Sequence, residues 1–260
     1  MRGGARAARE RCRGGRASPR AARRSGYALG VRTAAVLPVK RLADAKRRLG
    51  GTLPDAARAR LARAMVSDVL DALVRTAAIE RTFVITSEPS VAAEAAERGA
   101  RVLADSADAG QSAAVLLGVA AALAEGIERV LCIPGDCPAL EPAELLSLLG
   151  EGGAGGRPEV IVVPDRHGTG TNGLLLTPPD AIAPSFGPGS CARHRALARA
   201  AGASCRLAHP PSLLLDIDTG ADLAALRERL AGASAAAART RAVLGQPERH
   251  PILSTSTSGC

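Results

Sequence analysis

Aromatic residues are scarce in this sequence of 260 residues, which contains no Trp, one Tyr and two Phe although 47% of its residues are hydrophobic. A core must therefore be built from aliphatic side chains, and the length allows one core of good size. Proteins that bind single-stranded nucleic acids stack bases on aromatic rings. The composition consequently argues against that class of function.

Long apolar runs and paired cysteines are also missing. No stretch approaches the roughly 18 apolar residues of a membrane span, and the N-terminus lacks the apolar run of a secretory signal. The six cysteines form no C-x-x-C pair, and no histidine stands at zinc-finger spacing from them. These absences predict a reduced, cytoplasmic protein that does not bind membranes.

The net charge of +9 is confined to the N-terminus. Residues 1–32 contain ten arginines and one acidic residue, so the remainder is neutral overall and no nucleic-acid partner is predicted for it. We expect residues 1–32 to be a disordered tail, because they hold too few large apolar side chains to offset chain entropy. Residues 232–260 are expected to be a flexible C-terminal tail, which leaves one folded domain at 33–231.

Short apolar runs alternate with helical patterns through this domain. We expect strands at 33–39, 81–87, 100–105, 129–134, 159–165, 173–179, 204–208 and 212–218. The segments between them carry helix-like periodicity or helix-start residues, as in 54–74 and 190–202. The alternation predicts an α/β fold, a mostly parallel sheet with helices on both faces.

Lys40 and Lys46 are the only lysines among 34 basic residues. Chance is one explanation. The other is that a compact, mobile ammonium group is needed at these positions, as at a phosphate site.

Two aspartates stand where expected strands end. Asp136 and Asp218 would reach the same edge of the sheet, where carboxylates can share a Mg²⁺ ion with substrate phosphates. The alternative for Asp218 is to cap the helix that begins near Gly220. Asp216 is expected to tie a loop or to lie behind the metal ligands.

Two glycine-containing segments suit anions. "GTGTNG" (168–173) matches the dinucleotide fingerprint poorly, because a strand-like run follows it, but its backbone N–H groups could hold an anion. "FGPGSCARH" (186–194) places Gly and Ser before a helix, where the helix dipole favours a phosphate or carboxylate. Ser190 could also cap that helix, and His167 and His194 are expected to be solvated or in contact with an anion.

The segments "PVKRLADAKRRL", "GDCPAL", "PDRHGTGTNGLLL", "FGPGSCARH" and "LDIDTGADL" together resemble one family. It comprises the guanylyltransferases that activate 2-phospho-L-lactate or phosphoenolpyruvate during synthesis of the deazaflavin coenzyme. The resemblance covers residues 33–230. It implies one Rossmann-like nucleotidyltransferase domain, in which the substrate phosphate attacks the α-phosphorus of GTP and releases pyrophosphate.

The resemblance also implies roles for individual residues. Lys40 and Lys46 would contact the GTP phosphates, and Asp136 and Asp218 would bind Mg²⁺. The nucleophile is already an anion, so no general base is implied. A downstream transferase of coenzyme biosynthesis is the partner that the family suggests.

The acceptor, phosphoenolpyruvate or 2-phospho-L-lactate, would bind at Thr171, Gly187 and Ser190. None of these residues separates the two acceptors, although an arginine-rich composition typical of high-GC bacteria favours phosphoenolpyruvate. Gln111-Ser112 stands where family members commonly have Leu-Asn near the nucleotide base, which leaves the choice of guanine over adenine open.

Two other functions remain as alternatives. The sequence Asp216-x-Asp218 is a D-x-D, so a glycosyltransferase that uses a nucleotide-sugar is the first. The second is an RNA-binding protein that acts through the arginine-rich tail.

Overall fold

The computed structural model describes residues 30–150, 157–232 and 236–245. The expected N-terminal tail therefore lies outside the described residues, apart from residues 30–32. Residues 233–235 and 246–260 of the expected C-terminal tail also lie outside them.

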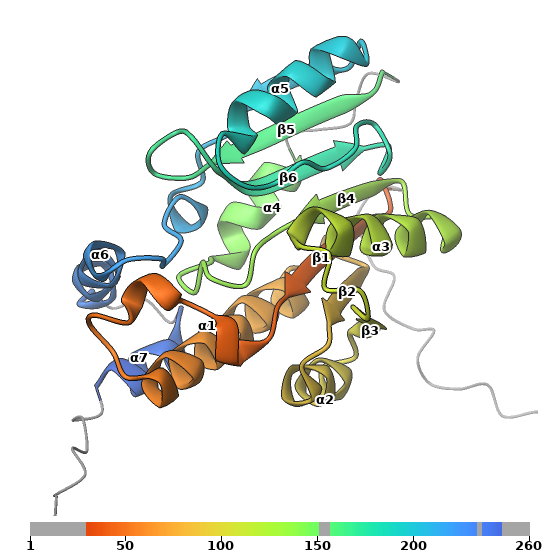
Figure 1. The fold of residues 1–260 in the computed structure, drawn as a ribbon. Helices are drawn as coiled ribbons and strands as arrows, with labels where there is room; N and C mark the ends of the chain where they lie inside the picture. The colour runs from red at the N-terminus through yellow and green to blue at the C-terminus, as the bar shows by residue number, and fades with distance from the viewer. Residues whose placement is uncertain (1–29, 151–156, 233–235, 246–260) are drawn as a thin grey trace, which may run out of the picture. The chain divides into compact units, whose positions relative to one another are not determined.

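Seven strands form one sheet in the order β3-β2-β1-β4-β6-β5-β7 (Figure 1). Their bounds are β1 (Thr33–Val39), β2 (Arg81–Thr86), β3 (Arg101–Ala104), β4 (Arg129–Cys132), β5 (Glu159–Pro164), β6 (Thr171–Thr177) and β7 (Ser204–Leu207). Only β6 is reversed: it pairs antiparallel with β4 and β5, while the other neighbouring pairs are parallel. The predicted mostly parallel α/β sheet is confirmed.

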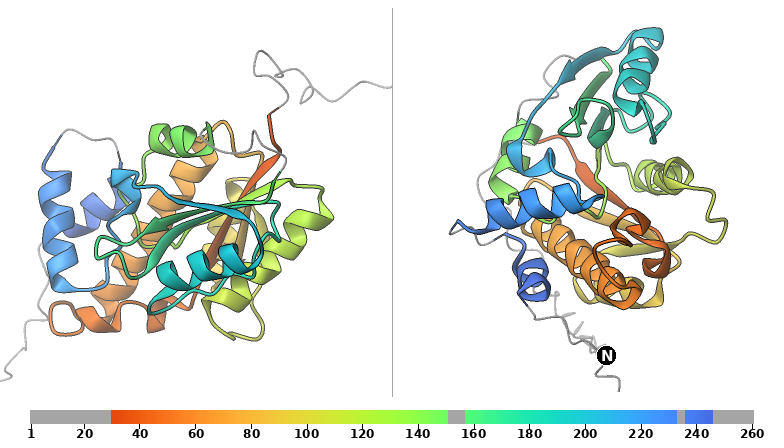
Figure 2. Two further views of the ribbon diagram at one scale, coloured as in Figure 1. Left: turned by 90° about the horizontal axis from the view of Figure 1, so that it is seen from above. Right: turned by 60° about the vertical axis from the view of Figure 1, so that its left-hand side comes forward.

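Helices cover both faces of the sheet (Figure 2). They are α1 (Asp55–Arg75), α2 (Pro89–Glu97), α3 (Gln111–Ala124), α4 (Pro142–Gly150), α5 (Ser190–Ala200), α6 (Gly220–Leu230) and α7 (Ala238–Leu244). Alternate residues of β1 face opposite cores, as the two-residue period of a strand requires. Leu37 belongs to the core that includes buried residues of α1, α2, α4 and α6, whereas Val36 belongs to the core that includes buried residues of α3 and α5.

The prediction of a strand at 212–218 is wrong. This segment begins with a 3₁₀-helix (Pro211–Leu213) and continues without strand pairing. Its apolar residues are buried nonetheless: Leu213 and Ile217 are fully buried in the core shared with α1 and α6. The apolar run therefore reflects packing into the core, which a continuous hydrophobic pattern cannot distinguish from a buried strand.

Helix α7 lies within the segment expected to be a flexible tail, and it packs on α1 (Figure 1). Asp68 of α1 is 6% exposed and accepts hydrogen bonds from the first turn of α7. Its carboxylate oxygens lie 3.0 Å from the backbone nitrogen of Arg239 and 2.8 Å from that of Thr240. The expectation of a flexible tail does not hold for residues 238–244. The Asp68 carboxylate of α1, far away in the sequence, satisfies backbone N–H groups at the start of α7 that have no partner within that helix.

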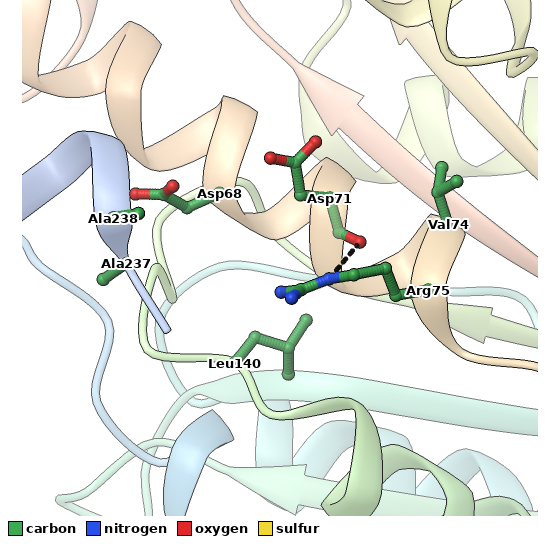
Figure 3. A pocket seen from close by; sticks show the side chains of 7 residues that line it. All are labelled: Asp68, Asp71, Val74, Arg75, Leu140, Ala237 and Ala238. Carbon is green, nitrogen blue, oxygen red and sulfur yellow. Dashed lines mark hydrogen bonds between the residues drawn. The ribbon is translucent and has the colours of Figure 1, made fainter. Parts of the chain in front are cut away.

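A cavity of about 210 Å³ lies between α1 and the start of α7 (Figure 3). Its lining residues are Asp68, Asp71, Val74, Arg75, Leu140, Ala237 and Ala238, none of which is a predicted site residue. Because Asp68 already caps α7 here, the charged lining has a structural explanation.

We expect Asp68→Ala to destabilise the protein by about 1–2 kcal/mol, the usual cost of losing a helix cap. In a domain of this size, such a loss lowers the melting temperature by roughly 4 °C. Thermal unfolding and amide hydrogen exchange at Arg239 and Thr240 would measure the effect. Asp180→Ala is the control, since Asp180 is exposed beyond the far end of β6; equal melting temperatures for the two variants would contradict the capping role.

None of the helices in the described ranges combines the length and apolar character that crossing a bilayer requires.

Candidate functional site

Two loops deliver three aspartates to one place at the edge of the sheet. Asp136 follows β4, and Asp216 and Asp218 follow the 3₁₀-helix at 211–213. The loops are joined by the backbone N–H of Ile217, which donates to the carbonyl of Asp136 at 3.1 Å. One carboxylate oxygen from each aspartate lies within 4.8 Å of the others, and we call these residues the acidic cluster.

Lys46 enters the acidic cluster from a loop after β1. Its Nζ lies 2.5 Å from Oδ2 of Asp136 and 2.9 Å from Oδ1 of Asp218, and its side chain is 9% exposed. Burial alone would lower the pKa of Lys46, but the carboxylates of Asp136 and Asp218 outweigh it and raise this pKa above its ordinary value. The guanidinium of Arg48, which is largely exposed, lies 3.7 Å from Oδ2 of Asp218, so Lys46 is the buried cation beside three carboxylates and the cluster can accommodate a further positive charge.

The first turn of α6 holds the backbone at Asp218, but the Asp218 carboxylate does not cap that helix. Thr219 is the N-cap of α6 and forms a capping box with Asp222. Asp222 also accepts from the backbone N–H of Asp218 at 3.1 Å and pairs with Arg166 at 2.5 Å. The alternative in which Asp218 caps this helix is therefore wrong.

The residues of the acidic cluster fit a divalent metal ion. Oδ1 of Asp136 is buried without a hydrogen-bond partner among the described residues, an arrangement that is costly unless a ligand completes it. Burial and the neighbouring charge of Asp136 raise the pKa of Asp216. Three carboxylates offer the hard oxygen ligands that such ions prefer, so the cluster could bind one.

The "GTGT" loop binds its own aspartate. The Asp165 carboxylate accepts from the backbone N–H groups of His167, Thr169 and Gly170 at 2.9–3.1 Å. Burial alone would raise the pKa of Asp165, but these hydrogen bonds outweigh it and keep this pKa below its usual range. The expectation that these N–H groups hold an external anion is wrong, because Asp165 already occupies them.

Thr171, Ser190 and His194 form a second group, which we call the hydroxyl cluster. The Ser190 hydroxyl lies 3.0 Å from Oγ1 of Thr171, and Nδ1 of His194 lies 3.1 Å from the same oxygen. Nε2 of His194 accepts from the backbone N–H of Ser185 at 2.8 Å. His194, expected to be solvated or in contact with an anion, is instead fully buried.

The loop before α5 is shaped by two glycines and one arginine. Gly187 and Gly189 have φ values of +109° and +71°, which disfavour any residue with a Cβ. Arg193 donates to the carbonyls of Ser185 and Pro188 at 3.1 and 2.7 Å and so wraps the loop from α5. The loop carrying the predicted acceptor residue Gly187 is thereby held in one conformation.

The two clusters are joined through consecutive residues at the start of β6. Thr171 belongs to the hydroxyl cluster, while the Nδ2 of Asn172 donates to Oδ1 of Asp216 at 3.1 Å. The register of β6 against β5 shifts at this point and leaves Asn172 without a paired residue on β5. Because Thr171 and Asn172 are consecutive in the chain, β6 still holds both clusters in a fixed relation.

All but two of the predicted site residues belong to these clusters, and the exceptions are Lys40 and Gly187. Gly187 lies in the loop before α5, where its carbonyl accepts from the backbone N–H of Ser190 at 3.0 Å. Lys46, Asp136 and Asp218 meet in the acidic cluster, and Thr171 and Ser190 meet in the hydroxyl cluster. Lys40 directly follows β1 and is exposed, and its side chain contacts neither cluster in the part of the chain that the structure describes.

Sequence reasoning missed Asn172, expected His194 in a different environment, and assigned Asp216 only to a loop contact or to a place behind the metal ligands. Asp216 lies two residues before Asp218, a spacing that brings side chains to the same side of an extended segment. His194 follows Ser190 by four residues, which places both on one helix face. Asn172 carried no such signal, because its partner Asp216 is 44 residues away.

His194 should make stability depend on pH. Burial, with a smaller effect of Arg193, lowers its pKa to about 4, whereas the unfolded chain has the ordinary value of about 6.5. Below pH 6.5 the unfolded state takes up a proton that the folded state binds only near pH 4, so stability falls as the pH decreases through this range. The loss should reach about 3 kcal/mol.

Urea unfolding of the wild type and of His194→Asn between pH 7.5 and 4 would measure this dependence. We expect the free energy of unfolding to fall less steeply with decreasing pH in the variant, which lacks the imidazole. Parallel curves for the two proteins would contradict the assignment of the low pKa to His194.

Comparison with known proteins places the chain in a family. Residues 33–237 match the family model described as "Guanylyl transferase CofC like". A protein of Conexibacter woesei named phosphoenolpyruvate guanylyltransferase is 51% identical over 214 residues, covering 82% of this chain and 96% of the relative. A protein of the same name from Rubrobacter xylanophilus is 41% identical and covers 74% of this chain and 92% of its own length.

Solved structures with lower identity share the fold. A nucleotide-diphospho-sugar transferase from Desulfovibrio desulfuricans G20 aligns with a TM-score of 0.65 at 17% identity, over 82% of this chain and 93% of that one. A nucleotidyl transferase from Methanothermobacter aligns with a TM-score of 0.55 at 22% identity, over 78% of this chain and 99% of that one. The family match over residues 33–237 and the identity to full-length relatives show that the chain belongs to the CofC-like guanylyl transferase family.

Proposed function

We propose that this protein transfers GMP from GTP to the phosphate of phosphoenolpyruvate and releases pyrophosphate. The proposal rests on 51% identity to the Conexibacter woesei relative that carries the name of this activity. The observation that supports it in the structure is the acidic cluster with Lys46, held next to the hydroxyl cluster by β6. Charge neutralisation and alignment are the main requirements of this chemistry, and the two clusters offer both.

The reaction has a simple balance of bonds. An oxygen of the acceptor phosphate forms a bond to the α-phosphorus of GTP, and the bond from that phosphorus to the bridging oxygen breaks. The electron pair leaves with pyrophosphate. Because the attacking oxygen is already an anion, none of this chain's side chains has to remove a proton.

We propose that the acidic cluster holds Mg²⁺, with Asp136 and Asp218 as ligands and Asp216 as an additional one. When bound there, the ion neutralises negative charge on the reacting phosphates. Lys46 adds a fixed positive charge beside Asp136 and Asp218 and is proposed to contact the GTP phosphates. Lys40 is exposed directly after β1, and we propose that its ammonium group also contacts the GTP phosphates.

The acceptor is proposed to bind at Thr171, Gly187 and Ser190. Two hydroxyl groups and a glycine loop with positive φ form a small polar site that a carboxylate or phosphate can approach closely. We propose that the mixed phosphoanhydride product passes to a downstream transferase of coenzyme biosynthesis. Both substrates are metabolites of the cytoplasm, which is the proposed compartment.

Pyrophosphate release from Mg-GTP tests the proposal. Phosphoenolpyruvate and 2-phospho-L-lactate should be offered separately, with ATP in place of GTP as a second comparison and a downstream enzyme to trap an unstable product. We expect release that depends on GTP and phosphoenolpyruvate. No release with either acceptor or nucleotide would contradict guanylyl transfer, and hydrolysis of a nucleotide-sugar without pyrophosphate would favour the glycosyltransferase alternative.

A further inference from the structure

The proposed chemistry gives no task to His194, although this residue is fully buried behind the predicted acceptor residues. Its imidazole lies edge-on to the ring of Phe186, with ring centroids 5.1 Å apart. Arg193 and Arg195 flank it along α5, and the guanidinium of Arg193 is turned to the carbonyls of the loop before that helix. A polar side chain in such a place needs partners for both ring nitrogens.

The hydrogen bonds of His194 determine its tautomer. A backbone N–H can only donate, so Nε2 of His194, which lies 2.8 Å from the nitrogen of Ser185, must be an acceptor without a hydrogen. The neutral ring then carries its hydrogen on Nδ1. That hydrogen is donated to Oγ1 of Thr171 at 3.1 Å.

A count of hydrogens shows the consequence of this tautomer. The hydroxyl cluster has three hydrogens to donate: one on Nδ1 of His194 and one on each hydroxyl group. Two hydrogen bonds join its members, so one hydroxyl hydrogen remains for an external acceptor. In the opposite tautomer Nδ1 would accept, and both hydroxyl hydrogens would be used inside the cluster.

The remaining hydrogen belongs to Thr171. Ser190 donates to Oγ1 of Thr171 and is 1% exposed, whereas Thr171 is 7% exposed and lies next to Asn172, the contact to the acidic cluster. Oγ1 of Thr171 thus accepts from two sides, which leaves its own hydrogen one open direction.

We propose that His194 is a positioning residue for the acceptor substrate: its Nδ1–H holds Thr171 so that the threonine hydroxyl donates to an anionic group of that substrate. This inference rests on the proposed function, since it takes Thr171 as an acceptor-binding residue. His194 acts through Thr171 and touches no substrate itself. Loss of this contact should therefore weaken binding of the acceptor substrate and leave binding of GTP unchanged.

Two substitutions of similar size separate the two hydrogen bonds of the imidazole. His194→Asn places an amide N–H where Nδ1 lies, so it keeps the bond to Thr171 and loses the one to Ser185. His194→Gln places an amide oxygen where Nε2 lies, so it keeps the bond to Ser185 and loses the one to Thr171. Both remove one hydrogen bond and the same aromatic ring, which makes them matched controls for loss of stability.

Steady-state kinetics with phosphoenolpyruvate and GTP should distinguish the variants. We expect His194→Gln to raise the KM for phosphoenolpyruvate about five- to tenfold, the effect of losing one hydrogen bond, with the KM for GTP unchanged. His194→Asn should keep the KM for phosphoenolpyruvate within about twofold of the wild type. In a Thr171→Ala background, His194→Gln should add no further increase, because the two residues act as one unit.

Equal KM values for phosphoenolpyruvate in the two variants, or additive effects with Thr171→Ala, would overturn the proposal. Absence of acceptor-dependent pyrophosphate release by the wild type would instead overturn the proposed function. If either variant fails to fold, the tautomer can be read in the wild type from ¹H–¹⁵N correlations of the histidine ring that resists titration. A hydrogen on Nδ1 supports the proposal, and a hydrogen on Nε2 would overturn it.

Discussion

Asp136→Asn should reduce kcat/KM for guanylyl transfer by about a thousandfold, equivalent to roughly 4 kcal/mol of transition-state stabilisation. The amide has the shape of the carboxylate but not its charge, and Oδ1 of Asp136 is the buried cluster oxygen without a partner. A metal ion held there would lose one of three anionic ligands. The fold should persist, because Lys46 keeps its contact with Asp218 at 2.9 Å.

Pyrophosphate release and calorimetric titration with Mn²⁺ would measure both consequences. Asp180→Asn makes the same chemical change at an exposed position beyond the far end of β6 and should leave both quantities unchanged. If Asp136→Asn stays within tenfold of the wild type and binds Mn²⁺ equally well, the acidic cluster is not the metal site.

Lys46→Met should abolish most activity and also destabilise the protein in the absence of metal. Removing the ammonium group leaves the three carboxylates facing one another, with only the largely exposed guanidinium of Arg48, 3.7 Å from Oδ2 of Asp218, to offset their charge. Breaking a buried ion pair costs about 3–5 kcal/mol, and we expect the lower end because Asp218 is partly exposed. A loss of about 3 kcal/mol corresponds to a melting temperature roughly 6–12 °C lower.

Thermal unfolding in EDTA and in Mg²⁺ distinguishes this electrostatic cause from lost packing. A divalent cation can replace part of the missing charge, so Mg²⁺ should raise the melting temperature of Lys46→Met more than that of the wild type. Lys40→Met is the matched control: Lys40 is exposed, so its loss should leave stability unchanged and raise only the KM for GTP. Equal melting temperatures for the two lysine variants would contradict the role of Lys46.

Local patterns predicted most of the sheet and its helices. The strand at 33–39 and the helix at 190–200 were predicted at or near their observed bounds, because hydrophobic periodicity and glycine boundaries act over a few residues. The segment 212–218 failed for the same reason. A continuous apolar run records burial alone, and Leu213 and Ile217 are buried without strand pairing.

Some residues of the candidate site could be selected from the sequence, and others could not. Asp136 follows a strand, Asp218 ends an apolar run and Ser190 begins a helix, and each of these signals lies within a few residues, so all three could be selected from sequence. The contact of Asp216 could not be predicted, since its partner Asn172 lies in β6, 44 residues away in the sequence. His194 was expected near solvent because no local pattern records that β6 and the loop at 185–189 enclose it.

The sequence by itself determined the fold class, the family resemblance and the residue types available for chemistry, since these depend on patterns within short segments. Only the tertiary structure decided which of those residues meet. Lys46 contacts Asp218 across 172 positions, and Asp68 caps a helix 172 positions away. Such contacts depend on how the chain folds back on itself, so short-range periodicity does not predict them.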